Sequence, residues 1–191
     1  MKKADLIIHN IGELVTLDGP ARPRAGRELQ ELGIMTKASV VVGHGKIEDF
    51  GPDSRIEAEW RANETIDAKG KLVTPGFVDP HTHPVFAETR WKEFEMRIEG
   101  ASYQEIAQSG GGIRNSARKL QKMPKDTLKA LVRDRLDHFL RLGTTTIEAK
   151  SGYGLSTDAE IKSLEILKEL NEEHPIDLVS TFLGAHEVPD E

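Results

Sequence analysis

The chain has 191 residues, of which 37% are hydrophobic and 30% are charged, and its formal net charge is −6. This length can bury a real core and the composition is that of a globular protein, while the negative balance argues against a nucleic-acid partner. Because the chain has no cysteine, a disulfide framework, a cysteine nucleophile and a thiolate metal site are excluded, so any metal ligands must be imidazole, carboxylate or water, which suit zinc or iron.

The first 70 residues are predicted to be β-rich and to form part of a small, sandwich-like β-domain. Short apolar or β-branched runs predict strands at residues 4–9, 13–17, 38–42, 47–50 and 65–68. Gly43-His44-Gly45-Lys46 predicts the turn of a hairpin between two of these runs. We expect a polar loop over residues 19–33 and a short helix over residues 57–63.

Residues 71–191 follow a different pattern, in which strands alternate with helices. Strands are expected over residues 72–78, 144–150 and 176–183. Between the first two, Ser102-x-x-Glu105 is a capping box that predicts a short helix, which the glycines at 110–112 should end.

Two longer helices are predicted from their caps and apolar stripes. Asp126 or Thr127 should begin the first, which Gly143 ends; its stripe is Leu128, Leu131, Val132, Leu136 and Phe139. The capping box Thr157-x-x-Glu160 should begin the second, which Pro175 ends; its stripe is Ile161, Leu164, Leu167 and Leu170. This alternation predicts an α/β fold with parallel strands and helical crossovers.

His81-x-His83 is the main clue to chemistry, because residues i and i+2 of a strand point to the same face and two imidazoles at this spacing can bind one metal ion. The pair follows an apolar strand, and Pro80 and Pro84 on either side suggest that the strand ends here. A lone pair of this kind is often only two surface histidines. Its position at the carboxyl end of a strand, where α/β barrels place their active sites, favours the metal site.

The stretch over residues 66–83 resembles the start of the barrel in the metal-dependent amidohydrolase superfamily. Within the superfamily the chain is most similar to the imidazolonepropionase family. Four segments carry this narrower resemblance, at residues 79–90, 110–113, 148–155 and 182–186. The resemblance covers nearly the whole chain, and residues 19–33 contribute little to it.

The resemblance implies a TIM-like (β/α)₈ barrel preceded by a small β-domain, of which this chain holds the first part: residues 1–70 from the β-domain and residues 71–191 from the barrel, with its first strands only. It also implies one zinc or iron ion with His81 and His83 as ligands. The remaining ligands, a histidine and an aspartate, and the catalytic glutamate would lie beyond Glu191, so the first ligand shell would be incomplete.

The family's reaction, as the resemblance implies it, is hydrolysis of the cyclic amide of 4-imidazolone-5-propanoate to N-formimidoyl-L-glutamate. Arg90 matches the family's arginine for the propanoate tail, and a guanidinium suits a carboxylate better than lysine does. Tyr153 and His186 match residues that contact the substrate. His186 could also be a third metal ligand or a helix cap, and substrate binding is favoured.

Several simpler interpretations stay open beside these. Arg90 could be a solvated surface residue and Tyr153 a packing aromatic. Glu148 and Lys150 share a strand face; we expect a structural pair rather than the metal-bridging carboxylated lysine of some amidohydrolases. Asp79 could orient a ligand histidine or cap the turn.

Two alternatives compete for the function of the whole: another amidohydrolase, such as a nucleobase-type deaminase, or an inactive fragment of the scaffold. The clamp formed by Arg90 and Tyr153 favours a substrate with a carboxylate tail over a neutral base. We expect a small-molecule substrate as partner, a homodimer by resemblance, and a cytoplasmic location, since no apolar stretch approaches the ~20 residues that a membrane span needs.

Overall fold

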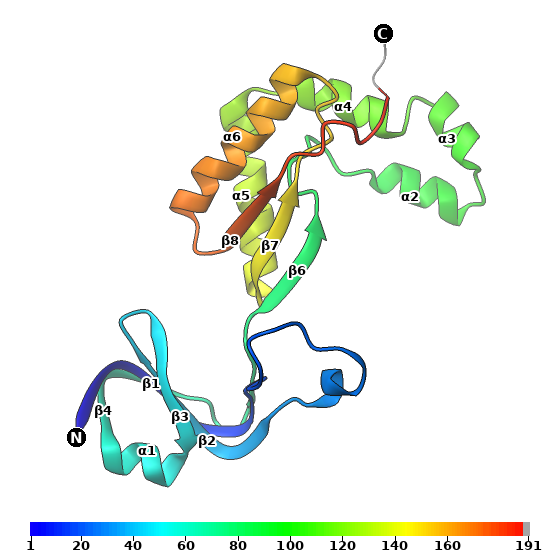
Figure 1. The fold of residues 1–191 in the computed structure, drawn as a ribbon. Helices are drawn as coiled ribbons and strands as arrows, with labels where there is room; N and C mark the ends of the chain where they lie inside the picture. The colour runs from blue at the N-terminus through cyan, green and yellow to red at the C-terminus, as the bar shows by residue number, and fades with distance from the viewer. Residues whose placement is uncertain (189–191) are drawn as a thin grey trace. The chain divides into compact units, whose positions relative to one another are not determined.

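A computed structural model describes residues 1–188. The chain divides into two compact units, Met1–Pro75 and Gly76–Glu191. The division follows Pro75 rather than residue 70, because β5 (Leu72–Val73) pairs with β1 (Lys2–Val15) in the sheet of the first unit. Figure 1 shows the two units, each with its own sheet.

The first unit is built on one five-stranded mixed sheet in the order β3-β2-β1-β4, with β5 on β1. The other strands are β2 (Ile34–Gly43), β3 (Lys46–Pro52) and β4 (Trp60–Asp67). The predicted hairpin is confirmed: β2 and β3 pair antiparallel, and His44 and Gly45 turn the chain with φ of 52° and 72°. The described residues of this unit form a single sheet, so a facing second sheet is not among them.

Three expectations for this unit are corrected. The runs at 4–9 and 13–17 are one strand with an irregularity between Ile8 and Ile11, where Asn10 has a φ of 54°. The loop over 19–33 contains a 3₁₀ helix, η1 (Gly26–Gln30). The helix expected at 57–63 lies earlier, as α1 (Asp53–Glu59), because the chain from Trp60 onward pairs with β1.

Two small apolar clusters hold this sheet. The first joins α1 to the sheet and comprises Ala4, Ile7, Val41, Ile56 and Trp60. The second comprises Ile11, Leu14, Ala38 and Val40. Burial of such side chains provides the main favourable free energy for a unit of this size.

The second unit is a three-stranded parallel sheet in the order β6-β7-β8, as the alternation predicted. Its strands are β6 (Phe77–Thr82), β7 (Thr144–Lys150) and β8 (Asp177–Thr181). Helix α5 (Lys125–Arg141) packs on β7 and α6 (Thr157–Glu173) on β8. Figure 1 shows both helices running beside the sheet.

Three shorter helices lie between β6 and α5 in the chain. They are α2 (Trp91–Ile98), α3 (Tyr103–Gln108) and α4 (Ile113–Lys122), and Figure 1 shows them past the carboxyl ends of the strands. The capping box of α3 is confirmed, because the Glu105 carboxylate accepts the Ser102 N–H at 2.7 Å. Helices α2 and α4 were not among the expected elements.

The two long helices differ from the prediction in their first residues and, for α6, in part of the buried face. Pro124 precedes the first turn of α5, so neither Asp126 nor Thr127 is the cap. The buried stripe of α5 matches the prediction at Leu128, Val132 and Leu136. The predicted stripe of α6 is confirmed at Leu167 and Leu170, but Ile161 is exposed and Leu164 is only partly buried. The other buried residues of α6 are Ala159, Glu160, Ser163 and Ile166.

These faces meet in one core. Buried residues of β7, α5, α6 and the segment after β6 form a single apolar cluster that includes Val85, Val132, Ile147 and Leu167. This cluster fixes the helices against the strands and so fixes the loops at the strand ends. Within residues 1–188, every helix is too short or too polar to traverse a bilayer.

Candidate functional site

The two histidines of the His-x-His motif lie at the carboxyl end of β6. His81 is the penultimate residue of the strand, which ends at Thr82, and His83 is one residue past it. Their ring centroids are 5.7 Å apart, with an angle of 60° between the planes. The intervening Thr82 is buried and donates its hydroxyl to the Glu148 carbonyl at 2.7 Å, so this strand end is anchored on β7.

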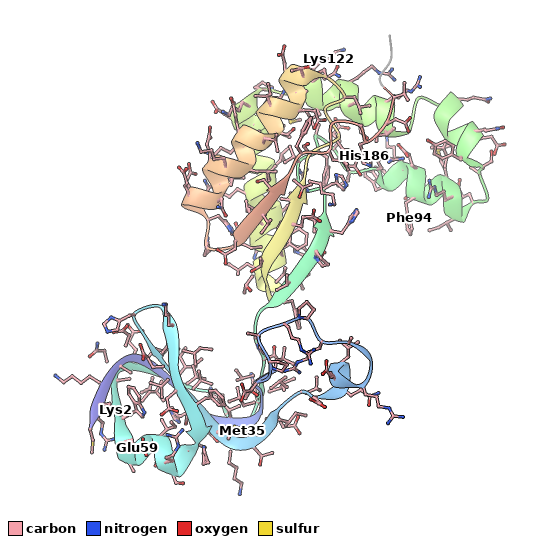
Figure 2. The ribbon with its side chains drawn as sticks, in the orientation of Figure 1. Lys2, Met35, Glu59, Phe94, Lys122 and His186 are labelled. Atoms are coloured by element: carbon pink, nitrogen blue, oxygen red, sulfur yellow. The ribbon has the colours of Figure 1, made fainter. Side chains whose placement is uncertain are left out.

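Three rings from three segments stack at this strand end. His83 lies 4.7 Å from His186 and 4.9 Å from Tyr153 between centroids, with planes 11° and 24° apart. Tyr153 and His186 are 5.4 Å apart. The structure therefore brings together three of the residues that the sequence singled out. Figure 2 labels His186, which lies past the end of β8; that strand ends at Thr181, earlier than predicted.

His83 has the properties of an available metal ligand. Its Nδ1 atom is buried and has no hydrogen-bond partner. Burial lowers the pKa of its imidazole, and the nearby His186 ring lowers it further, so the neutral form that binds metals is favoured. A buried imidazole nitrogen without a partner is costly unless something coordinates it, which fits the metal-ligand interpretation.

The Asp79 carboxylate binds the backbone at the strand end rather than a histidine ring. It accepts the backbone N–H of His81 at 3.1 Å. Of the two roles left open for Asp79, the structure shows the backbone one.

Tyr153 is carried by a tight loop after β7. The buried carboxylate of Glu160, in the first turn of α6, accepts hydrogen bonds from three N–H groups of this loop. They are those of Gly152 and Gly154 at 2.7 Å and of Leu155 at 3.1 Å. The capping box Thr157-x-x-Glu160 is therefore wrong: Ser156 precedes α6 without a side-chain cap, and Glu160 turns to the loop instead.

Arg90 lies just before α2 and is paired with Glu93. Its Nε and Nη2 atoms donate to Glu93 Oε2 at 2.8 and 2.7 Å. Glu93 Oε1 accepts the Gly112 N–H at 3.0 Å, so this carboxylate joins α2 to the triple-glycine segment. The hydrogen bond that Arg90 donates to Glu93 raises the pKa of Arg90, which keeps the guanidinium charged.

A cavity of about 360 Å³ places Arg90 with the stacked rings. Its lining is His83, Phe86, Glu88, Thr89, Arg90, Ser116 and Tyr153. A pocket of this size suits a small polar molecule. Its wall has the Arg90 guanidinium, which can bind an anionic group, and the rings of His83, Phe86 and Tyr153, which can contact a planar ring.

Glu148 and Lys150 form the ion pair that was expected of them. The Lys150 ammonium contacts Glu148 Oε1, which also accepts the Thr181 hydroxyl at 2.7 Å. The hydrogen bond from Lys150 lowers the pKa of Glu148. Both side chains are mostly buried, with 14% and 24% of their surface exposed.

The described residues contain no group of three or more His, Asp or Glu side chains close enough to hold a metal ion. Among these residues, His81 and His83 therefore have no third such side chain grouped with them. The ligands and the general base expected beyond Glu191 lie outside the residues that the structure describes.

Two residues around the site were missed by the sequence interpretation. Glu160 was assigned to a helix cap, although its spacing of three and seven residues from Ser163 and Leu167 places it on the buried stripe of α6. Glu93 was not considered at all. Its spacing of three residues from Arg90 was the available signal.

Comparison with known sequences gives a family and close relatives. A model described as "Amidohydrolase family" matches residues 64–120. The imidazolonepropionase of Herpetosiphon aurantiacus is 48% identical over 191 residues, which is 100% of this chain and 44% of the relative. That of Solibacter usitatus is 48% identical over 189 residues, or 98% of this chain and 45% of the relative. The chain thus spans less than half the length of these curated relatives.

Solved structures with the same fold include two deaminases. E. coli guanine deaminase superposes with a TM-score of 0.65 at 17% identity, covering 93% of this chain and 35% of that one. An adenosine deaminase from Xanthomonas campestris with bound zinc superposes with a TM-score of 0.56 at 14% identity, covering 95% and 43%. At such identities the likeness shows the fold alone.

Proposed function

Since this chain is related from end to end to imidazolonepropionases of the amidohydrolase family, we propose that it provides the substrate clamp and the first metal ligands of an enzyme that hydrolyses 4-imidazolone-5-propanoate to N-formimidoyl-L-glutamate. The observation that carries the proposal is the convergence of His83, Tyr153 and His186 at one strand end, with Arg90 in the same cavity wall as His83 and Tyr153. Sequence identity near half of all positions supports the same reaction.

In this proposal the chain's own residues bind and orient the substrate. The Arg90 guanidinium has donors beyond those used by Glu93 and binds the propanoate carboxylate. Tyr153 and His186 lie nearly parallel and suit a planar imidazolone ring beside them. The cavity holds the ring next to His83, where the amide carbon must be presented to the attacking water.

His81 and His83 would hold one divalent ion, zinc or iron. When bound, such an ion supplies a water of lowered pKa and polarises the amide carbonyl. The buried, unpartnered Nδ1 of His83 and its favoured neutral form are what fit the residues to this role. The proton for the leaving nitrogen must come from an acid that these residues do not include.

The proposal extends to the architecture and setting. The second unit provides the first three strands of a (β/α)₈ barrel, and the first unit belongs to the accompanying β-domain. By resemblance the complete enzyme is a cytoplasmic homodimer. Light scattering of the purified enzyme tests the dimer directly.

The decisive experiment uses the complete enzyme with imidazolonepropanoate as substrate. Formation of N-formimidoyl-L-glutamate is followed by mass spectrometry, and bound metal is measured by elemental analysis. We expect about one zinc or iron per chain, and loss of both metal and turnover in His81→Ala and His83→Ala. The control is His44→Asn, because His44 lies in the β2–β3 turn with a φ of 52°, which asparagine tolerates. Full turnover in both alanine variants would refute the proposal.

A further inference from the structure

The carboxylate of Glu160 is buried in the first turn of α6, yet it does not cap the helix. Only 4% of the surface of Glu160 is exposed. Oε2 accepts the Gly152 N–H, and Oε1 accepts those of Gly154 and Leu155. All three donors belong to the loop that carries Tyr153, so one side chain satisfies most of the backbone donors of that loop.

This loop has a backbone conformation that needs outside support. Leu155 has a φ of 50°, in the left-handed region that side chains rarely adopt, and Gly152 has a φ of 110°. A Cβ atom on Gly152 would lie 2.9 Å from the Cβ and Nδ1 atoms of His186. The loop is thus both strained and tightly packed.

The same loop also fixes His186. The Gly152 carbonyl accepts a hydrogen bond from His186 Nδ1 at 3.2 Å, which defines the ring's tautomer and tilt. Next to it, Ser151 Oγ accepts the Leu183 N–H at 3.0 Å, which ties the segment after β8 to this loop. A shift of the Gly152 peptide would therefore move Tyr153 and His186 together.

We infer that Glu160 is a positioning residue, which acts through the Ser151–Leu155 loop to set both Tyr153 and His186 in their stack with His83. The inference rests on the proposed function for what the stack binds. The effect of Glu160 on the loop is independent of that function. A charged acceptor for three buried N–H groups is hard to replace, since each unsatisfied group is costly.

Glu160→Gln removes one acceptor, because the amide nitrogen would face a backbone N–H. In the complete enzyme we expect kcat/KM for imidazolonepropanoate to fall about 10–100-fold, mostly through KM, since a misplacement of about 1 Å has effects of this size. Metal content should not change, because His81 and His83 come from β6. The matched control is Glu172→Gln, an exposed glutamate of the same helix, which should behave as wild type.

A double-mutant cycle separates positioning from general destabilisation. In a Tyr153→Ala background, Glu160→Gln should reduce kcat/KM less than it does in the wild type, because one of the two residues that Glu160 positions is already gone. Additive effects of the two changes would overturn the inference, as would unchanged kinetics in Glu160→Gln. If Glu160→Gln does not fold, Glu160→Asp keeps the charge with a shorter reach and should show the same rise in KM.

Limited proteolysis tests the loop without any substrate. Chymotrypsin should cleave after Tyr153 about tenfold faster in Glu160→Gln than in the wild type, while Glu172→Gln stays at the wild-type rate. If the wild-type enzyme fails to hydrolyse imidazolonepropanoate, the proposed function falls and this readout still decides the role of Glu160. Equal cleavage in all three proteins would overturn that role.

Discussion

Arg90 and Glu93 form a two-point contact, in which the guanidinium donates through Nε at 2.8 Å and Nη2 at 2.7 Å to a single carboxylate oxygen. The other oxygen of Glu93 binds the Gly112 N–H, so the arginine is held by a group that is itself anchored. Glu93 does not use all the donors of the guanidinium, and Arg90 lines a cavity together with His83 and Tyr153.

Replacing Arg90 tests the carboxylate clamp. In the complete enzyme, Arg90→Ala should lower kcat/KM for imidazolonepropanoate about 100-fold, since hydrogen bonds to charged groups contribute about 1.5–3 kcal/mol. Arg90→Lys should recover only part of this, because an ammonium lacks the planar fork. Steady-state kinetics measure both, and unchanged kinetics in the alanine variant would rule out the clamp.

Replacing Glu93 tests whether the orientation of Arg90 matters. Glu93→Gln keeps the shape but weakens the ion pair, so we expect KM to rise about threefold to tenfold, less than in Arg90→Ala. The double variant Arg90→Ala/Glu93→Gln should be no worse than Arg90→Ala alone. Glu95→Gln, an exposed glutamate of the same helix, is the control. A KM in Glu93→Gln equal to that of the control would show that the pair is only structural.

The strand order and the residues at the strand ends could be predicted because they depend on local patterns. A threonine-rich run and a helical stripe predicted β7 and α5, whereas the strand expected over 72–78 is divided between β5 and β6. Tyr153 and His186 were expected at the site through the family resemblance. Their stacking with His83 was not predictable, since it depends on the loop conformations that carry them.

The parts that sequence reasoning missed depend on contacts between distant segments. Glu160 fits a capping box as well as it fits a loop anchor, and only the burial of its helix face decides between them. Likewise, a helix was expected over 57–63, but pairing of Trp60 with Lys2 draws that stretch into the sheet. Tertiary pairing overrides local preference in both cases.

The contact between Lys150 and Glu148 favours a structural ion pair over a carboxylated lysine that bridges metal ions. A carboxylated lysine would be an anion and would repel Glu148, whereas the Lys150 ammonium contacts that carboxylate. We therefore expect Lys150→Met to keep its metal content and to melt at a lower temperature, because the Glu148 carboxylate is left without its ion-pair partner. Elemental analysis and thermal melting measure the two effects. Loss of metal at unchanged stability would favour the bridging role instead.

Asp49 should make the stability of the first unit depend on pH. Its carboxylate accepts two hydrogen bonds from Arg55, at 2.8 and 2.9 Å, and one from the Trp60 indole at 3.0 Å. The pairing with Arg55 lowers the pKa of Asp49 from 3.8 to about 2. Since the folded state holds its proton less tightly than the unfolded state, the contribution is complete above about pH 4 and is lost as the pH falls toward 2.

Comparison of wild type with Asp49→Asn isolates this contribution. The asparagine variant should melt at a lower temperature at pH 5, by an amount that reflects on the order of 1 kcal/mol after allowing for solvent screening. The gap should narrow at pH 3, because Asp49 of the unfolded wild type is then largely protonated and must release its proton on folding, whereas the variant has no such proton to release. Melting curves at the two pH values measure this. A gap of the same size at both would mean that the carboxylate's charge does not stabilise the fold, and that its hydrogen-bonding shape alone matters.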